Sequence, residues 1–561
     1  MSGTAARTLL DTAFGDGARL TALLDARNTT TCDSKPWLHY VALVPRGWDG
    51  HSGPPVLSDS PPVILESNTD FHRWTWDRAR VRLTLCAGEL PKVLGQLQLQ
   101  AHEVWWVHAI DADSVGMSIK ALASLCQPGA SVHTTPSWAA LADWHAAGFA
   151  QLEPSAPQQA QALPDHGQVA GPAATLSRLT FAPAWPVRRS RQAHRVNVHR
   201  PARCVVVGAG VSGAAIADAM ARRAWAVTVV EADTQAAQGG SGVPAALIAP
   251  LPSADDNPAT RLTRHGLRWM RQTLHSLSAA GLLHQGLDWE ASGVTRVLET
   301  GERQWQADGL WLRPAALVRA WLAHPQIRFC GGCQVARISR QDACWQLDGE
   351  DGRPLAQAEL VVFANALGCQ KVLFPADIEP RAASALSMLR AAYGTVSLGL
   401  TGGLAHVPAA PVNGAGSLIP ALPGPRHAEP RRWLVGADFS AQPLPITQAH
   451  AANLHRMQAL APDMLAAWHD EAANQLPDAL AHWQGQRCIS HDRMPLVGPL
   501  LPAPDASLWI SAGMGARGMA WAGVCAEWLA SRISGEPWPL ARDLARHMDS
   551  QRSRTLIRDK T

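Results

Sequence analysis

The stretch Arg203-Cys-Val-Val-Val-Gly-Ala-Gly-Val-Ser-Gly213 decides the fold that this chain is expected to have. Its β-branched run, Val205 to Val207, predicts a buried parallel strand, and the glycines after it have the spacing Gly-x-Gly-x-x-Gly. Residues 214–224 are rich in alanine and predict a helix, and residues 226–230 predict a second strand that ends at Glu231. This order of strand, glycine turn, helix and acid-terminated strand is typical of a dinucleotide-binding unit.

Each part of this unit has a physical task. Gly208 permits the tight turn, Gly210 lets a pyrophosphate approach the backbone, and Gly213 lets the helix pack closely on the strand. The helix N-terminus, where Ser212 lies, supplies free N–H groups and the positive end of the helix dipole. Glu231 is placed to accept hydrogen bonds from ribose hydroxyls. The fingerprint alone does not separate FAD from NAD.

Length and composition indicate a globular protein of several domains. A chain of 561 residues is too long for one hydrophobic core, so we expect about two to four domains. The formal net charge of +3 is small and neither demands nor excludes a nucleic-acid partner. The ten cysteines have no framework spacing, which predicts reduced thiols in a cytoplasmic protein.

The sequence shows no sign of a membrane or a metal. Residues 1–14 lack a signal-peptide pattern, and no apolar run reaches the ~18 residues of a membrane span. Cys330 and Cys333 form a single Cys-x-x-Cys pair, and a zinc site would need a second pair nearby. We therefore predict no membrane partner and no metal site. The role of this pair stays open between a glycine turn and a redox function.

The chain is expected to divide at a basic linker. Residues 1–185 alternate between predicted strands and helices, which indicates a parallel sheet. Residues 204–561 form the second predicted unit, in which antiparallel β regions interrupt the nucleotide-binding sheet. Residues 186–203 are either solvated charge at a domain boundary or a strip that contacts phosphates, and their arginines are Arg188, Arg189, Arg191, Arg195, Arg200 and Arg203.

Two glycine-rich turns far from the fingerprint favour FAD. One is Gly239-Gly-Ser-Gly-Val-Pro244, and the other is Met514-Gly-Ala-Arg-Gly518, which lies between a predicted strand and helix. Such turns can direct backbone N–H groups at flavin oxygens, whereas NAD folds do not normally return a C-terminal glycine turn to the cofactor. The further candidate cofactor-binding residues are Gly240, Ser241, Gly242, Gly515, Ala516, Arg517 and Gly518.

Together these motifs resemble the family of bifunctional tRNA 5-methylaminomethyl-2-thiouridine biosynthesis proteins. The resemblance is carried by the fingerprint, both glycine turns, the stretch 309–314 and the block 487–498. It implies an α/β protein with two parts. The first is a degenerate Rossmann-like methyltransferase unit that would use S-adenosylmethionine. The second is an FAD-binding Rossmann domain with an inserted antiparallel β substrate region, similar to D-amino-acid oxidase.

The N-terminal resemblance is partial. Phe14-Gly-Asp-Gly17 is similar to the cofactor turn of the family, but His108 stands where the family has a key acid. Asp111 or Asp113 would substitute for that acid only if the loop were rebuilt. These departures favour the loss of methyltransferase activity, and the sequence leaves the use of S-adenosylmethionine open.

The resemblance implies a reaction on tRNA. The second unit would oxidatively remove the carboxymethyl group from 5-carboxymethylaminomethyl(-2-thio)uridine at the anticodon wobble position. A substrate carboxylate suits a bidentate arginine, and the resemblance assigns this catalytic-site role to Arg487 and Arg517. The implied partner is tRNA and not DNA, with the basic linker and the tail 552–560 as candidate phosphate contacts. The oligomeric state is not predicted.

Two other functions remain open at the level of sequence. The same fold would suit an FAD-dependent oxidase of free glycine or other amino acids, which would turn over small amines without tRNA. The altered N-terminal motifs would also suit a non-catalytic tRNA-binding paralogue, which would purify without flavin colour. Val243, Ala245 and Ala246 replace residues that are more usual in the family, so substrate preference or rate could differ.

Overall fold

A computed structural model of the chain describes most of its residues: 6–29, 35–50, 54, 57, 63–66, 69–106, 112–134, 141–151, 177–186, 201–374, 380–424, 429–472, 480–501 and 506–552. The chain divides into two compact units. The first is Met1–Val198 with Ser531–Ala545, and the second is His199–Ala530 with Arg546–Thr561. No helix among the described residues is long and apolar enough to cross a membrane.

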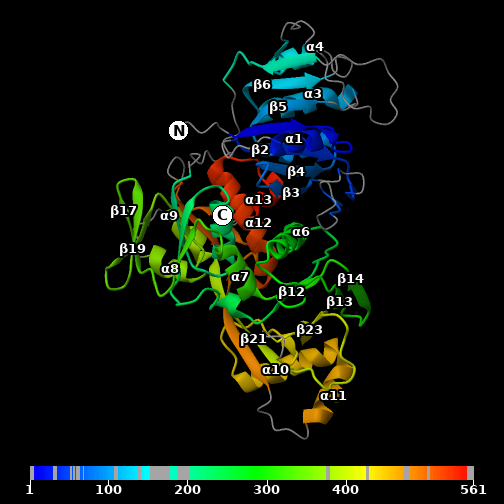
Figure 1. The fold of residues 1–561 in the computed structure, drawn as a ribbon, viewed down its shortest axis with the longest axis vertical. Coiled ribbons are helices and arrows are strands. Elements are labelled where there is room, and N and C mark those ends of the chain that lie inside the picture. The colour runs from blue at the N-terminus through cyan, green and yellow to red at the C-terminus, as the bar shows by residue number, and fades with distance from the viewer. Residues whose placement is uncertain are drawn as a thin grey trace, which may run out of the picture. The chain divides into compact units, whose positions relative to one another are not determined.

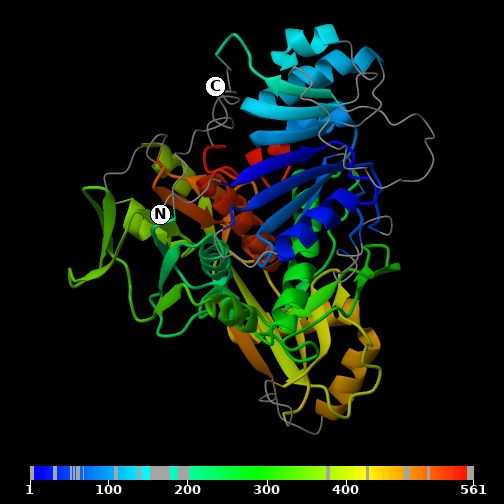
Figure 2. The same ribbon diagram turned by 45° about the horizontal axis from the view of Figure 1, so that its top comes forward.

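The first unit contains an eight-stranded sheet in the order β3-β4-β2-β1-β5-β6-β8-β7 (Figures 1 and 2). The five strands from β4 to β6 are parallel, and the others pair antiparallel. The strands are β1 Arg7–Asp11, β2 Leu38–Val44, β3 Asp70–Trp76, β4 Val81–Ala87, β5 Ala101–Trp106, β6 Cys126–Thr134, β7 Phe149–Gln151 and β8 Ser177–Phe181. The helices are α1 Ala18–Asn28, α2 Leu90–Gln96, α3 Ala112–Leu125 and α4 Leu141–Ala146.

The hydrophobic core of this unit has two clusters. Leu9 belongs to one and Leu10 to the other, because successive residues of a strand point to opposite faces of the sheet. The mostly parallel sheet follows the predicted alternation of strands and helices. Strand β2 lies on one side of β1, and β5 lies on the other side. The order in which the chain adds strands to the sheet therefore changes direction between β1 and β5.

A C-terminal segment completes the first unit, although the sequence-based boundaries did not include it. Glu536 forms an ion pair with Arg82 at 2.6 Å, and both side chains are buried. The backbone N–H of Trp538 donates to the carbonyl of Gln98, and Ala541 belongs to the core of the unit. The residues of the C-terminal segment that make these contacts belong to no recognisable sequence motif.

The second unit is built on a six-stranded sheet in the order β16-β10-β9-β20-β27-β26. Its neighbours pair in parallel except for β26. The predicted strands at 205–207 and 226–230 and the helix after the fingerprint are confirmed as β9, β10 and α5. The elements are β9 Arg203–Val207, α5 Val211–Ala221, β10 Ala226–Val230, β16 Ile327–Cys330, β20 Leu360–Phe363, β26 Leu496–Pro499, β27 Leu508–Ala512 and α12 Gly518–Ser534.

The predicted antiparallel region is confirmed as a seven-stranded sheet in the order β14-β13-β22-β23-β24-β21-β25, in which neighbours pair antiparallel except for β13 and β22. The long strand β21 pairs with both β24 and β25, and α10 lies against this sheet (yellow and orange in Figure 1). The elements are β13 Val294–Val297, β14 Arg303–Gln306, β21 Leu389–Leu400, β22 Val412–Asn413, β23 Ser417–Leu422, β24 Arg432–Gly436, α10 Ile446–Leu460, α11 Pro462–Ala472 and β25 Ala481–Ser490.

Smaller elements connect these two sheets. Helix α6 begins after Asn257, whose side-chain oxygen accepts a hydrogen bond from the backbone N–H of Thr260. The remaining elements of the second unit are η3 Gly240–Gly242, β11 Ala246–Ile248, α6 Pro258–Ala279, β12 Trp289–Glu290, β15 Leu310–Leu312, α7 Pro314–Leu322, β17 Arg337–Gln341, β18 Cys344–Asp348, β19 Pro354–Ala358, α8 Gly368–Leu373, α9 Pro380–Ser387 and η5 Gly515–Arg517. The last helix, α13 Arg542–Arg546, lies mostly in the C-terminal segment of the first unit.

Candidate functional site

The turn between β9 and α5 requires glycine at two positions. Gly208 has a φ of 101°, and a Cβ there would lie 2.7 Å from the Cα of Asn365. A Cβ at Gly213 would lie 1.8 Å from the carbonyl oxygen of Gly208. Both distances are too short for real atoms, so the backbone of this turn packs as closely as the fingerprint predicts.

Glu231, directly after β10, holds this turn in place. Its Oε2 accepts a hydrogen bond from the backbone N–H of Ala209 at 2.6 Å, and its Oε1 accepts one from Asp233 at 3.2 Å. A carboxylate has about four lone-pair sites, so two further hydrogen bonds from ribose hydroxyls remain possible. Glu231 also lines the cavity described below.

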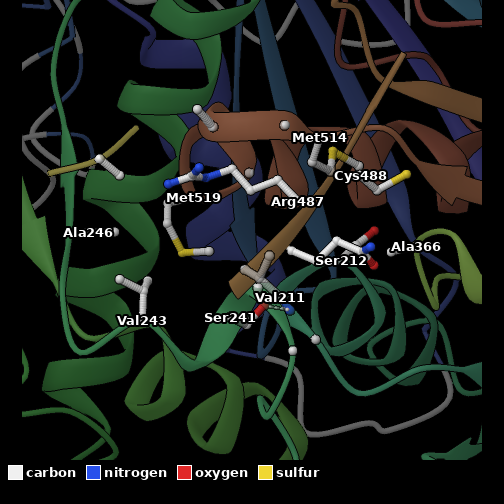
Figure 3. Close-up of a pocket in the computed structure, with 18 of the residues that line it drawn as sticks. Val211, Ser212, Ser241, Val243, Ala246, Ala366, Arg487, Cys488, Met514 and Met519 are labelled. Atoms are coloured by element: carbon white, nitrogen blue, oxygen red, sulfur yellow. Dashed lines mark hydrogen bonds between the residues drawn. The ribbon is translucent and has the colours of Figure 1, made fainter. Parts of the chain in front are cut away.

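Segments that are distant in sequence meet at the start of α5. The hydroxyl of Ser241, in η3, accepts a hydrogen bond from the N–H of Val211 at 2.9 Å (Figure 3). The hydroxyl of Ser212 donates to the carbonyl of Ser511 at 3.1 Å, which ties the helix to β27. The fingerprint, the turn after β10 and the C-terminal strand therefore form one site.

A cavity of about 500 Å³ runs along this site. That volume lies within the range of small-molecule and cofactor pockets. Most of the predicted cofactor residues line it, and these are Gly208, Gly210, Ser212, Glu231, Gly240, Ser241, Gly515, Ala516 and Gly518. Gly213 and Gly242 are not among its lining residues. Gly213 packs beneath the turn, and a Cβ at Gly242 would lie 2.9 Å from the carbonyl oxygen of Ala237.

Arg487, on β25, is the one cationic side chain among the described residues that line the cavity. It extends across Gly394 of β21, where a Cβ would lie 1.9 Å from its Nη1. Nη1 donates to the carbonyl of Asp438 at 3.2 Å, and the guanidinium lies 5.5 Å from the ring centroid of Phe439. Burial lowers the pKa of Arg487 while the charge of Asp438 opposes this, and an arginine still remains cationic at neutral pH. The guanidinium thus keeps donors for an anion in the cavity.

Arg517 has a different position. It lies in the C-terminal turn, and its guanidinium is 5.5 Å from the ring centroid of Trp521. It is not among the described residues that line the cavity. Burial and the nearby charge of Arg493 lower its pKa. Its assignment as a second carboxylate anchor therefore stays a prediction.

The cavity suits a flavin dinucleotide. Asn365, directly after β20, lines it, and the buried Oδ1 of Asn365 has no hydrogen-bond partner among the described residues. A buried acceptor without a partner is costly, so a ligand donor at this point would satisfy it. Together with the close-packed glycine turn, the acid and the helix N-terminus, this fits FAD. No motif in the sequence marks Asn365 as a site residue.

Among the described residues of the first unit, an arginine side chain lies in the crevice where S-adenosylmethionine would be expected to bind. In open α/β sheets a ligand binds at the carboxyl ends of the strands where the strand order reverses, which is here between β1 and β5. Asp11 ends β1, is fully buried and already pairs with the Arg19 guanidinium and the Tyr40 hydroxyl. The guanidinium also covers the Trp105 ring at 4.4 Å.

Three further features lie around this crevice. Although burial acts to lower it, the charge of Asp11 raises the pKa of Arg19, so the guanidinium stays charged. A Cβ at Gly17 would lie 2.5 Å from Pro54, which covers the glycine turn. The residues after β2 are Pro45 and Arg46, with no acid to accept ribose hydroxyls.

Several residues singled out in the sequence lie outside the described part of the chain. These are His108, Asp111, most of the basic linker (187–200) and the tail from 553 onward. Asp113 lies in α3, but its side chain is not described. Within the described tail, Arg552 pairs with Asp492 at 2.7 Å.

Comparison with known proteins identifies the family of the chain. Residues 203–308 and 302–532 match the family described as FAD dependent oxidoreductase, so the second unit is an FAD-dependent oxidoreductase domain. Over most of its length the chain is also similar to proteins named tRNA 5-methylaminomethyl-2-thiouridine biosynthesis bifunctional protein MnmC. It is 34% identical to that of Albidiferax ferrireducens, covering 98% of this chain and 94% of the relative. It is 33% identical to that of Polaromonas sp., covering 86% and 79%.

The chain belongs to this MnmC family of bifunctional proteins. Among solved structures, a glycine oxidase from Geobacillus kaustophilus is 17% identical with a TM-score of 0.47, covering 60% of this chain and 95% of that one.

Proposed function

We propose that this protein removes the carboxymethyl group from 5-carboxymethylaminomethyl(-2-thio)uridine in tRNA by FAD-dependent oxidation of a CH–NH bond. The observation that carries the proposal is Arg487, the one cationic side chain among the described residues that line the cavity, which lies beside the predicted flavin site. The names of the relatives point to modified uridine in tRNA, and the substituent to be removed is an N-alkylated glycine with one carboxylate. An arginine with free donors is the side chain best suited to bind it.

The reaction follows from how the chain would hold its substrate. Bound FAD would supply a hydride acceptor for the C–H bond next to the amine nitrogen. Arg487 would bind the carboxylate and fix that C–H bond in one orientation. The amine nitrogen loses its proton and becomes an imine, which water hydrolyses to glyoxylate and the 5-aminomethyl base. The apolar wall around Val396, Ile419 and Leu434 would limit the entry of further water.

The glycine turn, Glu231, Ser241 and Asn365 would hold the dinucleotide. Glu231 would accept from the ribose, the N-terminus of α5 and Ser241 would face the pyrophosphate, and Asn365 would accept one hydrogen bond at its free Oδ1. The glycines Gly515 and Gly518 would approach from the C-terminal turn.

We propose that the second activity of the family, methylation of the aminomethyl product, is absent from this chain. The first unit would keep the methyltransferase-like architecture, while Arg19 occupies the crevice where S-adenosylmethionine would bind. A tRNA substrate would place the protein in the cytoplasm.

An oxidase of free glycine or other amino acids is the main rival, because Arg487 would bind any small N-substituted glycine. The test incubates the purified flavoprotein with tRNA that carries the carboxymethylaminomethyl nucleoside and, separately, with glycine and sarcosine. Glyoxylate release and nucleoside mass spectrometry are measured in each case. We expect conversion of the tRNA nucleoside at micromolar substrate and little turnover of the free amines. Efficient turnover of glycine with unchanged tRNA would favour the rival.

A further inference from the structure

Phe439 is an exposed aromatic side chain at the edge of the cavity. Its side chain is 57% exposed, yet it lines the same cavity as Arg487. Among the large apolar side chains that are exposed in the described part of the chain, Phe439 alone lines this cavity. The contact with Arg487 leaves more than half of the ring exposed, and exposed aromatic rings are a usual means of holding an unstacked base.

The backbone beneath Phe439 is firmly held. The neighbouring Asp438 is buried, and its Oδ1 accepts from the N–H of Thr395 at 2.6 Å. On the other side, Ser440 and Tyr393 exchange backbone hydrogen bonds of 2.8 and 3.2 Å. The segment that carries the ring is therefore fixed to β21 from both sides, so the ring is presented in a preorganised position.

The position of the ring relative to Arg487 matches the proposed substrate. The guanidinium carbon lies 5.5 Å from the ring centroid. In the substrate, four single bonds of roughly 1.5 Å each join the carboxylate carbon to the base. A substrate whose carboxylate is held by Arg487 would therefore bring its pyrimidine within reach of the exposed part of the ring.

We propose that Phe439 is the stacking platform for the wobble base, and this inference rests on the proposed function. A base splayed out of the anticodon stack loses its neighbours, and an aromatic face replaces part of that stacking without reading the sequence. Arg487 would then recognise the amino-acid part of the substrate, and Phe439 the nucleobase part. Together they would favour a nucleoside over a free amino acid.

The test separates these two parts of the substrate. Wild type, Phe439→Leu and Phe439→Trp are prepared with bound FAD, and the rate of flavin reduction without oxygen is measured at increasing ligand concentration, which gives an apparent Kd. One ligand is the 5-carboxymethylaminomethyluridine nucleoside, and the other is sarcosine, which has the carboxylate but no base. We expect Phe439→Leu to raise the Kd of the nucleoside roughly tenfold and that of sarcosine less than twofold. Phe439→Trp should restore nucleoside binding because it keeps an aromatic face.

Phe329→Leu is the matched control, since Phe329 is also exposed, lies on β16 and is not among the cavity-lining residues. An unchanged nucleoside Kd in Phe439→Leu, or an equal loss for both ligands, would overturn the stacking role. If the wild type binds sarcosine but not the nucleoside, the proposed function itself fails, and that result is distinct from a failure of Phe439 alone.

Discussion

At the scale of the residue, Arg487 is the side chain on which substrate binding depends. Its guanidinium donates a hydrogen bond to the carbonyl of Asp438. It lies in a space that exists only because Gly394 has no side chain. Loss of a buried charged partner typically weakens binding by several kcal/mol, because the remaining charge is left without compensation. Arg487 therefore determines the affinity for the carboxylate more than any other group that lines the cavity.

We expect Arg487→Ala to lower kcat/KM for the modified tRNA by roughly 100-fold, which corresponds to about 3 kcal/mol. Arg487→Lys should recover only part of this loss, because lysine keeps the charge but not the bidentate geometry. Arg517→Ala is expected to cost less, since its guanidinium packs on Trp521. Steady-state kinetics with glyoxylate detection measure all three. Equal losses for Arg487→Ala and Arg517→Ala would instead support two anchors.

At the scale of the element, the turn from β9 into α5 links the fold to the cofactor. Gly208→Ala would force a Cβ against the backbone of Asn365 at a φ of 101°. We expect this variant to purify without the visible absorbance of flavin and to melt at a lower temperature. The destabilisation should be about 3 kcal/mol. Gly402→Ala is the control, because nothing lies within 4 Å of its added Cβ. Normal flavin content in Gly208→Ala would contradict the packing described for this turn.

The start of α1 leads to a prediction about the first unit. Arg19 extends back from α1 onto Asp11, so the crevice already holds a cation where a ligand would sit. S-adenosylmethionine carries sulfonium and ammonium charges and would compete with that guanidinium. We expect isothermal titration of the intact protein to detect no binding at ligand concentrations up to about the millimolar range. A micromolar Kd, or methyl transfer to the aminomethyl nucleoside, would show that the crevice opens.

At the scale of the whole molecule, the C-terminal segment 531–545 contributes to the stability of the first unit. Removal of one partner of a buried ion pair leaves an uncompensated charge, so Glu536→Ala should destabilise this unit by about 3 kcal/mol. Glu89→Ala is the control in the same unit, because its pair with Lys92 is exposed and should contribute less than about 1 kcal/mol. Thermal melts followed by tryptophan fluorescence would compare the two. Equal melting temperatures would show that the segment is dispensable.

The sequence predicted those parts of the molecule that depend on local patterns. The β-branched runs and glycine spacing predicted β9, α5 and β10, and the acid after β10 lies where it was expected. Because these features arise from neighbouring residues, a single sequence contains enough information to predict them.

Contacts between residues that are distant in the sequence could not be predicted from local patterns. Asn365 stands in no motif, and only the fold shows that its Oδ1 is buried and has no hydrogen-bond partner among the described residues. Phe439 stands in no motif, and its exposure beside Arg487 depends on the pairing of β21 with β24 and β25. The contact of Arg19 with Asp11 likewise appears only when α1 folds back over the strand end.

The most direct test of the central claim is mass spectrometry of the wobble nucleosides in tRNA from cells that lack this protein. We predict that 5-carboxymethylaminomethyl(-2-thio)uridine accumulates, and that a copy of the wild-type gene, but not one encoding Arg487→Ala, restores the aminomethyl form or its downstream products. A nucleoside profile indistinguishable from that of the parent cells would contradict the claim.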